Sequence, residues 1–165
     1  MKKLVPTLIA VAMLSAISAA TAWAEGTPMV LAAVAEGKFG PAPPMLPPGA
    51  KLAVLSGNPM ATGAYAVRIR MPANYAIPAH SHPTDENVVI TTGSVTIGMG
   101  EKLSKKAAGN KMLKVGGFAL MPSGMNHYAF AGASGADIVL YGQGPVEFKY
   151  VNPADDPRNA KPSMK

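Results

Sequence analysis

Two of the chain's three histidines lie in one short stretch, HSHPTDENVVITTG, together with two acidic residues. Imidazole nitrogens and carboxylate oxygens are common ligands of transition metals. Residues two or four apart in a β-strand point to the same side, so His80, His82 and Glu86 share one side, whereas Asp85 does not. The spacing predicts a metal site formed by these three residues, with Asp85 as an outward-facing neighbour.

The third histidine, His127, follows a Pro-x-Gly turn in the stretch PSGMNH. We expect it to enter the next strand and to complete a set of three imidazoles and one carboxylate. Burying such groups on an apolar face is costly unless charges are paired, and a divalent cation supplies that pairing. The alternative is that these residues are hydrogen-bonded core residues or scattered surface residues.

The elements that must position these residues are short apolar runs separated by Gly, Pro and Asn. Their spacing and their content of Val, Ile, Tyr and Phe are typical of an antiparallel β sandwich or barrel, so the predicted class is all-β. No sustained helical period follows the N-terminal segment, although EKLSKKAA could form a turn or two. The predicted strands cover residues 52–57, 64–71, 87–93, 95–99, 117–122, 127–132, 136–142 and 146–151.

One predicted strand, AYAVRIRM, alternates clearly. Val67, Ile69 and Met71 share one face, and Arg68 and Arg70 share the other. We interpret the arginine face as the solvated side of a sheet; the alternative is a site for an anionic ligand.

The N-terminus has the layout of a secretory signal peptide. Two lysines precede an apolar run, and small residues end in Ala22-Trp23-Ala24. The run is too short, and too often interrupted by Ser and Thr, for a membrane span. We therefore expect cleavage after Ala24, a periplasmic or secreted location, and no membrane association of the mature form. The absence of cysteine excludes disulfides and an N-terminal lipid-modified cysteine.

Cleavage would leave 141 of the 165 residues and lower the formal charge from +6 to +4, because Lys2 and Lys3 are removed. One domain is expected at that length. The predicted organisation is a signal peptide (1–24), an extended proline-rich arm without regular structure that lies over the domain or over a partner subunit (25–50), a β-barrel domain (51–151) and a loose tail (152–165). Five lysines without an aromatic residue in 102–114 indicate a solvated loop and no nucleic-acid partner.

The two histidine segments resemble the two conserved motifs of the cupin superfamily. The first motif, G(X)5HXH(X)3-4E(X)6G in family terms, is matched by His80, His82, Glu86 and Gly93. The second, G(X)5PXG(X)2H(X)3N, is matched by Gly116, Pro122, Gly124 and His127. Asn74 stands in place of the leading glycine, and Ala131 replaces the final asparagine. Asparagine tolerates a left-handed backbone, so the first departure is mild, and the second changes a turn or capping residue rather than a ligand.

The resemblance covers residues 51–150 and extends to a group of small exported bacterial cupins. It implies a cupin jelly-roll barrel, usually dimeric, with a metal held inside by His80, His82, Glu86 and His127. It does not imply a particular reaction. The ligand set suits several metals; copper or zinc is favoured if the protein acquires metal after export, while manganese, iron and nickel remain alternatives.

Two functional hypotheses follow. The first is an enzyme of the oxygenase, isomerase or lyase type that acts on a small molecule bound to the metal through oxygen. The second is a non-catalytic protein that binds or stores a metal or a small ligand, for which Met121 and Met125, at strand parity with His127, could supply soft sulfur. Methionine is more often a flexible core residue. No separate catalytic base is identified, although Glu86 could release the metal and take a proton. Tyr65, Tyr75 and Tyr128 are candidates only because they are near the motifs in sequence, and each is more often a packed strand residue.

Overall fold

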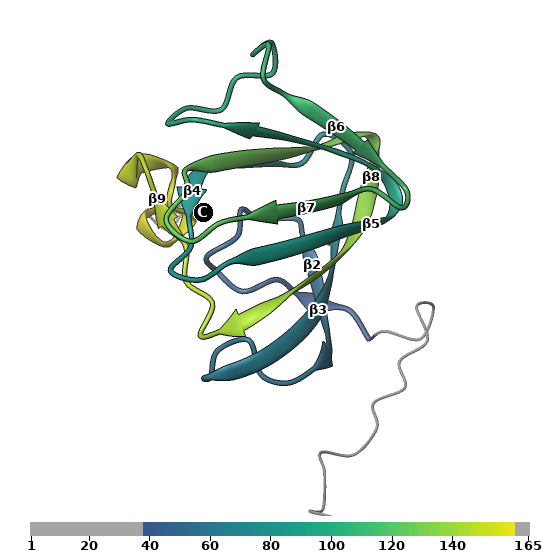
Figure 1. Ribbon diagram of the computed structural model, residues 1–165, viewed down its shortest axis with the longest axis vertical. Helices are drawn as coiled ribbons and strands as arrows, with labels where there is room; N and C mark the ends of the chain where they lie inside the picture. Colours follow the sequence, from purple (N-terminus) through teal and green to yellow (C-terminus); the bar gives the residue numbers. More distant parts are fainter. Residues whose placement is uncertain (1–37, 161–165) are drawn as a thin grey trace, which may run out of the picture.

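The structure, a computed structural model, describes residues 38–160. The predicted signal peptide, the first part of the predicted arm and the end of the tail lie outside the described residues. Within the described part, no helix is long and apolar enough to span a membrane. Figure 1 shows the strands β1 (Gly40–Pro41), β2 (Lys51–Ser56), β3 (Gly63–Met71), β4 (Ala76–Ser81), β5 (Glu86–Met99), β6 (Lys111–Lys114), β7 (Phe118–Met121), β8 (His127–Gly144) and β9 (Lys149–Tyr150), and the 3-10 helices η1 (Pro153–Asp155) and η2 (Pro157–Asn159) follow them.

Strands β5 and β8 are the two longest, and they pair antiparallel along almost their whole length. Gly93 in β5 and Gly135 in β8 have positive φ values of 67° and 77°. A Cβ atom on Gly93 would collide with the carbonyl oxygen of Gly135, so the close approach there also requires glycine. We predicted two strands, 87–93 and 95–99, with Gly93 ending the first; instead, β5 continues through a bend at this glycine.

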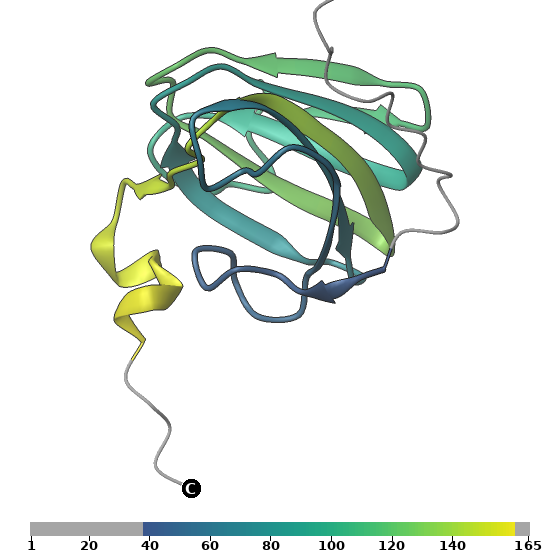
Figure 2. The same ribbon diagram turned by 90° about the horizontal axis from the view of Figure 1, so that it is seen from below.

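Because of these bends, each long strand contributes to two layers. The first half of β5 pairs with β7 and its second half with β6, while β8 pairs with β4 and then with β3. One layer has the order β1–β2–β3–β8–β5–β7 and the other β9–β4–β8–β5–β6. This is an antiparallel jelly roll, which confirms the predicted all-β cupin barrel. Figure 2 shows the two short 3-10 helices beside this barrel.

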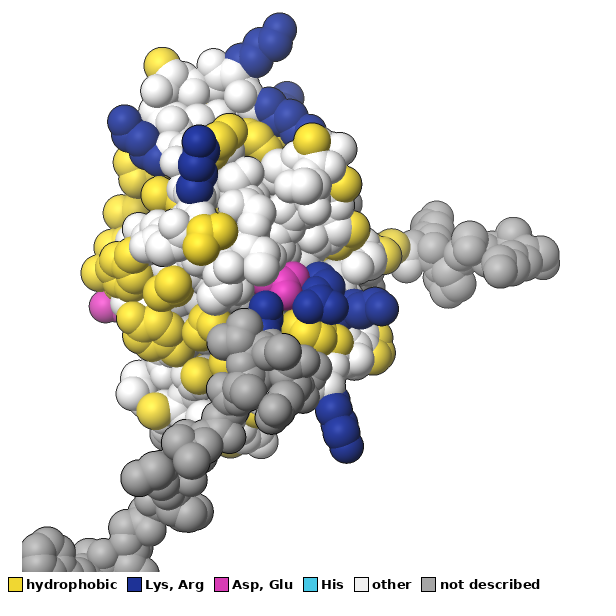
Figure 3. All heavy atoms as spheres, turned by 90° about the vertical axis from the view of Figure 1, so that its right-hand side faces the viewer, with side chains coloured by type: hydrophobic (Ala, Val, Ile, Leu, Met, Phe, Trp, Pro, Cys, Tyr) yellow, Lys and Arg dark blue, Asp and Glu magenta, His cyan; other side chains and the backbone are white. Residues whose placement is uncertain are grey.

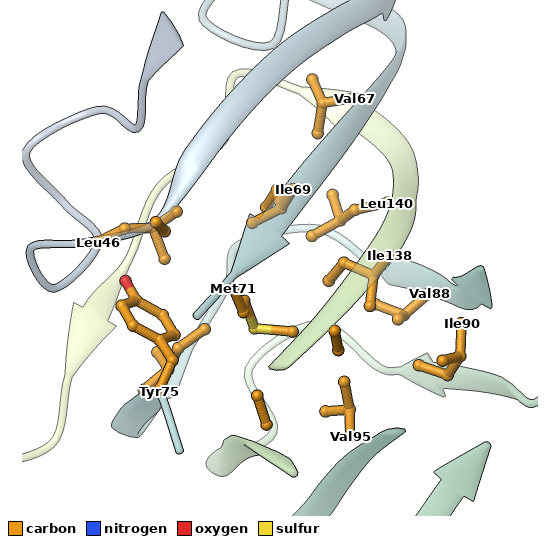
Figure 4. Close-up of a cluster of buried hydrophobic side chains, with 14 of the residues drawn as sticks. Leu46, Val67, Ile69, Met71, Tyr75, Val88, Ile90, Val95, Ile138 and Leu140 are labelled. Carbon is orange, nitrogen blue, oxygen red and sulfur yellow. The ribbon is translucent and has the colours of Figure 1, made fainter. Parts of the chain in front are cut away.

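The hydrophobic core lies between the two layers. As predicted, β3 turns Val67, Ile69 and Met71 inward, with only 2%, 4% and 2% of their surface exposed. They meet Ile138 and Leu140 from β8 (Figure 4). Full burial of a side chain of this size contributes about 1.5–3 kcal/mol.

The outer face of β3 differs from the prediction of a solvated arginine face. Arg70 is half exposed, but Arg68 is buried with 4% exposure and forms an ion pair of 2.9 Å with the buried Asp137 of β8. Arg68 is buried because the cross-strand aspartate, which spacing in β3 cannot reveal, neutralises it. Figure 3 shows one place on the surface where acidic and basic side chains meet in this way.

Strands β4 and β6 were not predicted, and neither was the short β1. Strand β4 contains Pro78, which cannot donate a ladder hydrogen bond; it is accommodated where the register shifts between Ile77 and His80. Strand β6 lies in the lysine-rich stretch that we predicted to be a solvated loop. Its lysines are exposed, as is typical of a short, charged edge strand.

The described part of the proline-rich arm folds onto its own barrel. It was predicted to lack regular structure, yet Gly40–Pro41 forms a short strand paired with β2. Beyond that strand, Met45 and Leu46 enter the core with 8% and 5% exposure. The prolines exclude an extended ladder, but they do not prevent a two-residue strand or the burial of Met45 and Leu46.

Candidate metal centre

The bend of β5 brings both ends of that strand to one end of the barrel (Figure 1). Glu86 is the first residue of β5, and Met99, the last, lies opposite His127 at the start of β8. His127 is also the cross-strand partner of His80 on β4. The topology therefore gathers residues from three strands at the barrel end away from the bend.

His82 and Glu86 lie on either side of a chain crossing between the two layers. His82 follows β4 directly, Pro83–Asp85 form the turn, and Glu86 begins the next strand. Shared strand parity therefore explains His80 and His82 only. Glu86 reaches the same interior because the chain crosses over, not because the three residues share a strand.

The loops that carry the histidines are joined by hydrogen bonds. The Ser123 backbone N–H donates to the exposed carboxylate of Asp85 at 2.8 Å, and the Ser123 hydroxyl donates to the Pro83 carbonyl at 2.7 Å. Gly124, whose φ of 74° suits glycine, donates to the His82 carbonyl at 2.8 Å. Asp85 thus faces outward and fixes one loop against the other.

All three imidazoles are oriented in the same way. Each Nδ1 lies at hydrogen-bonding distance from a backbone carbonyl oxygen: His80 with Pro78 at 2.6 Å, His82 with Glu147 at 2.8 Å and His127 with Met125 at 3.0 Å. A carbonyl can only accept, so each Nδ1 carries a hydrogen, and in the neutral ring Nε2 presents a lone pair. Metal-binding histidines are oriented by the same kind of bond.

The Nε2 side of this group is suited to a cation. One ligand atom from each of the three buried histidines lies within 4.8 Å of the other two. Glu86 is also buried; its oxygens lie 3.3 Å from His82 Nε2 and 3.8 Å from His127 Nε2. Despite that proximity, His82 Nε2 has no hydrogen bond among the described residues. Buried lone pairs that face a carboxylate require a proton or a metal ion between them.

The ionisation of the group determines how it would bind a metal. Burial lowers the pKa of His80 to about 3, reinforced by repulsion from His127 and His82, and burial also lowers the pKa of His127. Burial opposes a charge on His82 as well, but the adjacent Glu86 outweighs it and raises the pKa of His82. Burial alone would raise the pKa of Glu86, yet its histidine neighbours lower it. Burial thus keeps His80 and His127 neutral, whereas Glu86 favours a proton on His82, which a metal ion would have to displace before His82 could bind it.

Phe148 supports the histidines and was not predicted as a site residue. Its ring stacks on His80 with centroids 4.6 Å apart and meets His82 edge-on at 4.5 Å. It lies in the predicted strand 146–151, of which only Lys149–Tyr150 is β9. Alternation with Val146 and Tyr150 hinted at an inward position, but no spacing rule connects it to the histidines.

Three spaces adjoin the group in the described part of the chain, one of them a small cavity shared by Glu86 and Tyr65. A cavity of about 40 Å³ inside the barrel is lined by His80, Glu86, His127 and Met121 among others, which is room for an ion and a water molecule rather than a substrate. A cleft of about 350 Å³ on the outside reaches His127 between β6 and β7. The interior cavity therefore accommodates a metal but no larger ligand.

The tyrosine candidates have different surroundings. Tyr128 donates to Asn110 at 2.8 Å, and the Tyr75 hydroxyl donates to the Pro47 carbonyl, so both are engaged structurally. Tyr65 alone shares a small cavity with Glu86. Burial, followed by the charge of Glu86, raises the pKa of Tyr65.

The departures from the cupin motifs are also accounted for. Asn74 has a φ of 59°, so it adopts the left-handed backbone expected at the leading glycine position. Ala131 is 2% exposed within β8. It is a strand residue rather than the turn or capping position we expected, and a small apolar side chain fits there.

No protein-family model and no curated protein matches the chain. Solved structures match its fold at low identity. A candidate acetylacetone dioxygenase from Methylibium petroleiphilum matches with a TM-score of 0.60 and 18% identity over 80% of this chain and 87% of that chain. The polyketide cyclase RemF from Streptomyces resistomycificus matches with a TM-score of 0.59 and 15% identity over 79% and 90%.

A third structure carries the family name. It is an RmlC-like cupin from Shewanella frigidimarina, with a TM-score of 0.52 and 14% identity over 68% of this chain and 87% of that chain. At such identities the similarity concerns the fold alone. The jelly-roll topology and these structural neighbours establish that the chain has the fold of the cupin superfamily.

Proposed function

We propose that the protein is a metalloenzyme that binds one divalent transition metal through His80, His82, Glu86 and His127. Its substrate would be a small molecule that reaches the metal through an oxygen atom. The observation that carries the proposal is the common orientation of the three imidazoles, whose Nδ1 hydrogens point to backbone carbonyls. Their lone pairs then face one another and a carboxylate, an arrangement that a cation stabilises.

A bound metal would supply Lewis acidity and, if redox-active, chemistry with dioxygen. The chain supplies positioning and proton transfer. Phe148 and the backbone carbonyls hold the imidazole rings, and the apolar cavity wall limits the access of water. Glu86 has two carboxylate oxygens near the group, so one can remain a ligand while the other accepts a proton from substrate.

Turnover is favoured over storage for two reasons. Four protein ligands leave open positions on a metal that accepts five or six. The neighbours named as a dioxygenase and a cyclase indicate that this fold supports catalysis, although of different kinds. The second candidate, a binding or storage protein, is favoured by one observation: Met45 and Leu46 of the arm are buried in the barrel, and Leu46 lines the interior cavity, which leaves little room for a substrate there.

The metal determines which reactions are possible. Three imidazoles and a carboxylate suit copper and zinc, and also manganese, iron or nickel. We favour copper or zinc because metal uptake after export would select by affinity. Zinc has no redox chemistry, so a zinc protein would be a lyase or isomerase, whereas copper would permit an oxygenase.

Elemental analysis of natively produced protein tests this proposal. We expect about one equivalent of metal in the wild type, and in Asp85→Asn, but much less in Glu86→Gln. Asp85 and Glu86 are adjacent acids, of which only Glu86 faces the histidines. Equal metal contents in both variants would refute the assignment of Glu86, and a metal-free wild type would refute the function.

We also propose that the protein is exported and that it forms a homodimer. Export rests on the N-terminal sequence, and the dimer on the resemblance to cupins. N-terminal sequencing of protein from the cell envelope should find Glu25 as the first residue. Sedimentation analysis should give twice the mass of the mature chain.

A further inference from the structure

The barrel has a lateral cleft between β6 and β7. Both strands pair with the same edge of β5, one with each half, and no pairing between them occurs in the described part of the chain. Figure 1 shows them diverging where the two layers separate. The cleft of about 350 Å³ lies here and has the size of a small-molecule site.

The walls of the cleft are apolar and accessible. Met99, Phe118, Leu120 and Met125 line it with 70%, 52%, 49% and 37% of their surfaces exposed. Figure 3 shows hydrophobic side chains gathered along one side of the molecule. Large apolar side chains clustered on a surface typically mark a site that another molecule covers.

The cleft lies directly against the metal site, and His127, only 3% exposed, forms part of the wall between them. His127 lines both the cleft and the interior cavity, as do Ile97 and Met121. On the side of the arm, the buried Leu46 lines the interior cavity, and the arm is held by a hydrogen bond of 2.8 Å from the Tyr150 hydroxyl to the Met45 carbonyl. A ligand too large for the interior can thus approach His127 from the cleft.

The polar lining indicates the chemistry of the occupant. Besides His127, Lys111 of β6 is the charged residue on the cleft wall. An anionic oxygen would be attracted to this lysine or to the metal, while an apolar body would contact the methionine, phenylalanine and leucine side chains.

We propose that the lateral cleft binds the substrate, a small apolar molecule with one anionic oxygen group such as a carboxylate, enolate or phenolate. One part of this inference, that the molecule bound in the cleft is a substrate of the metal centre, rests on the proposed metal function. Binding in the cleft itself depends only on the walls and on Lys111, so it can be tested with and without metal.

The first test uses 8-anilinonaphthalene-1-sulfonate, an apolar anion, titrated into metal-free protein by calorimetry. Lys111→Glu and Met99→Trp should weaken binding at least about tenfold, through charge reversal and filling of the cleft. The matched controls, Lys114→Glu and Met112→Trp, change exposed residues of β6 that do not line the cleft and should stay within about twofold. Equal binding by all variants would overturn the proposal.

The second test uses 4-nitrocatechol, whose absorption changes when it coordinates a metal, mixed with the metal-loaded variants. Met99→Trp should slow coordination at least about tenfold while its metal content remains that of the wild type. If Met99→Trp reacts normally and Leu46→Ala reacts faster, the entrance is the arm end and the cleft proposal is wrong.

Two further outcomes separate the alternatives. If the wild type is a dimer that Met99→Trp or Lys111→Glu converts to a monomer, a second copy covers the cleft, and the substrate proposal fails. The other outcome is a wild type that holds no metal, while Lys111→Glu and Met99→Trp still bind the apolar anion more weakly than their controls. In that case the cleft binds such a molecule and the proposed metal function fails.

Discussion

Two clusters of buried charge, one inside the barrel and one on its outer face, differ in how they are neutralised. On the outer face, Arg68 and Asp137 form an ion pair of 2.9 Å, and Arg70 adds two hydrogen bonds of 2.9 Å to the same carboxylate. The Phe39 ring lies 4.1 Å from the Arg70 guanidinium and 5.7 Å from that of Arg68. The chain itself supplies both signs of charge there.

The inner cluster combines a carboxylate with three imidazoles whose Nδ1 atoms are occupied by backbone carbonyls. Burial keeps His80 and His127 neutral, so within the group only a proton on His82, whose pKa is raised by Glu86, can match the charge of Glu86, and a metal ion would take the place of that proton. A buried cluster whose charges are paired by its own residues indicates a structural role, even though Arg68 Nε and Nη1 have no hydrogen-bond partner among the described residues. A cluster that still needs a cation indicates a binding site.

The largest expected effect is the loss of metal stabilisation. His80→Ala and His127→Ala should remove the metal, and with it about 4 kcal/mol of stability when free metal exceeds its dissociation constant a thousandfold. Thermal unfolding with and without a chelator measures this. The chelator should destabilise the wild type and leave the stability of both variants unchanged. A wild type whose stability does not respond to the chelator would contradict the claim that the inner cluster, unlike the outer one, needs a metal ion.

Breaking the outer cluster should be about as costly but independent of metal. Asp137→Asn leaves Arg68 buried without its counter-charge, which should lower the free energy of unfolding by about 3 kcal/mol. Chemical denaturation measures this value in metal-free and metal-loaded protein. A cost that appears only with metal present would connect the two clusters and contradict the account.

The contribution of Asp137 should also depend on pH. The hydrogen bond from Arg70, aided by the charges of both arginines, lowers the pKa of Asp137. Its stabilisation is therefore complete above the unfolded pKa of about 3.9 and is lost as pH falls through the lower folded value. The stability difference between wild type and Asp137→Asn should be constant from pH 7 to about pH 4 and shrink below that; a difference that disappears near pH 6 would be inconsistent with this pair.

The support from Phe148 should have a smaller effect. Phe148→Leu keeps an apolar side chain but removes the stack on His80, so metal affinity should fall about tenfold, within the range seen when groups that orient ligands are changed. Competition with a chelator of known affinity measures the change. Unchanged affinity would mean that the backbone carbonyls alone orient the rings.

The smallest effect is expected at Arg70. Its side chain is 51% exposed, and such ion pairs contribute about 0–1 kcal/mol. Arg70→Ala should therefore cost less than about 1 kcal/mol, far less than Asp137→Asn. A larger loss would indicate that Arg68 alone cannot neutralise the aspartate.

The sequence predicted the residues that meet at the site but not how they are held. Strand alternation correctly predicted the inward face of β3, and the two motifs identified every residue of the histidine and glutamate group. The orientation of the imidazoles depends on carbonyls such as that of Glu147, 65 residues from His82. The pattern of side chains along the sequence does not reveal which backbone carbonyls will accept these hydrogen bonds.

Long-range contacts account for the other failures. Asp137 lies 69 residues from Arg68, so the outer ion pair could not be inferred from the alternation of β3 alone. Pro78 concealed β4 because a register shift, which no local rule predicts, accommodates it. Met45 and Leu46 were hidden in a proline-rich stretch that favours an extended arm whether or not it packs on the barrel.

X-ray absorption spectroscopy of the natively loaded metal tests the central claim most directly. The account predicts three imidazole nitrogens and at least one oxygen at about 2.0–2.2 Å. His127→Ala, if it retains any metal, should show one imidazole fewer. A sulfur ligand at about 2.3 Å, or fewer than three imidazoles in the wild type, would contradict the assignment of His80, His82, Glu86 and His127 as the metal centre.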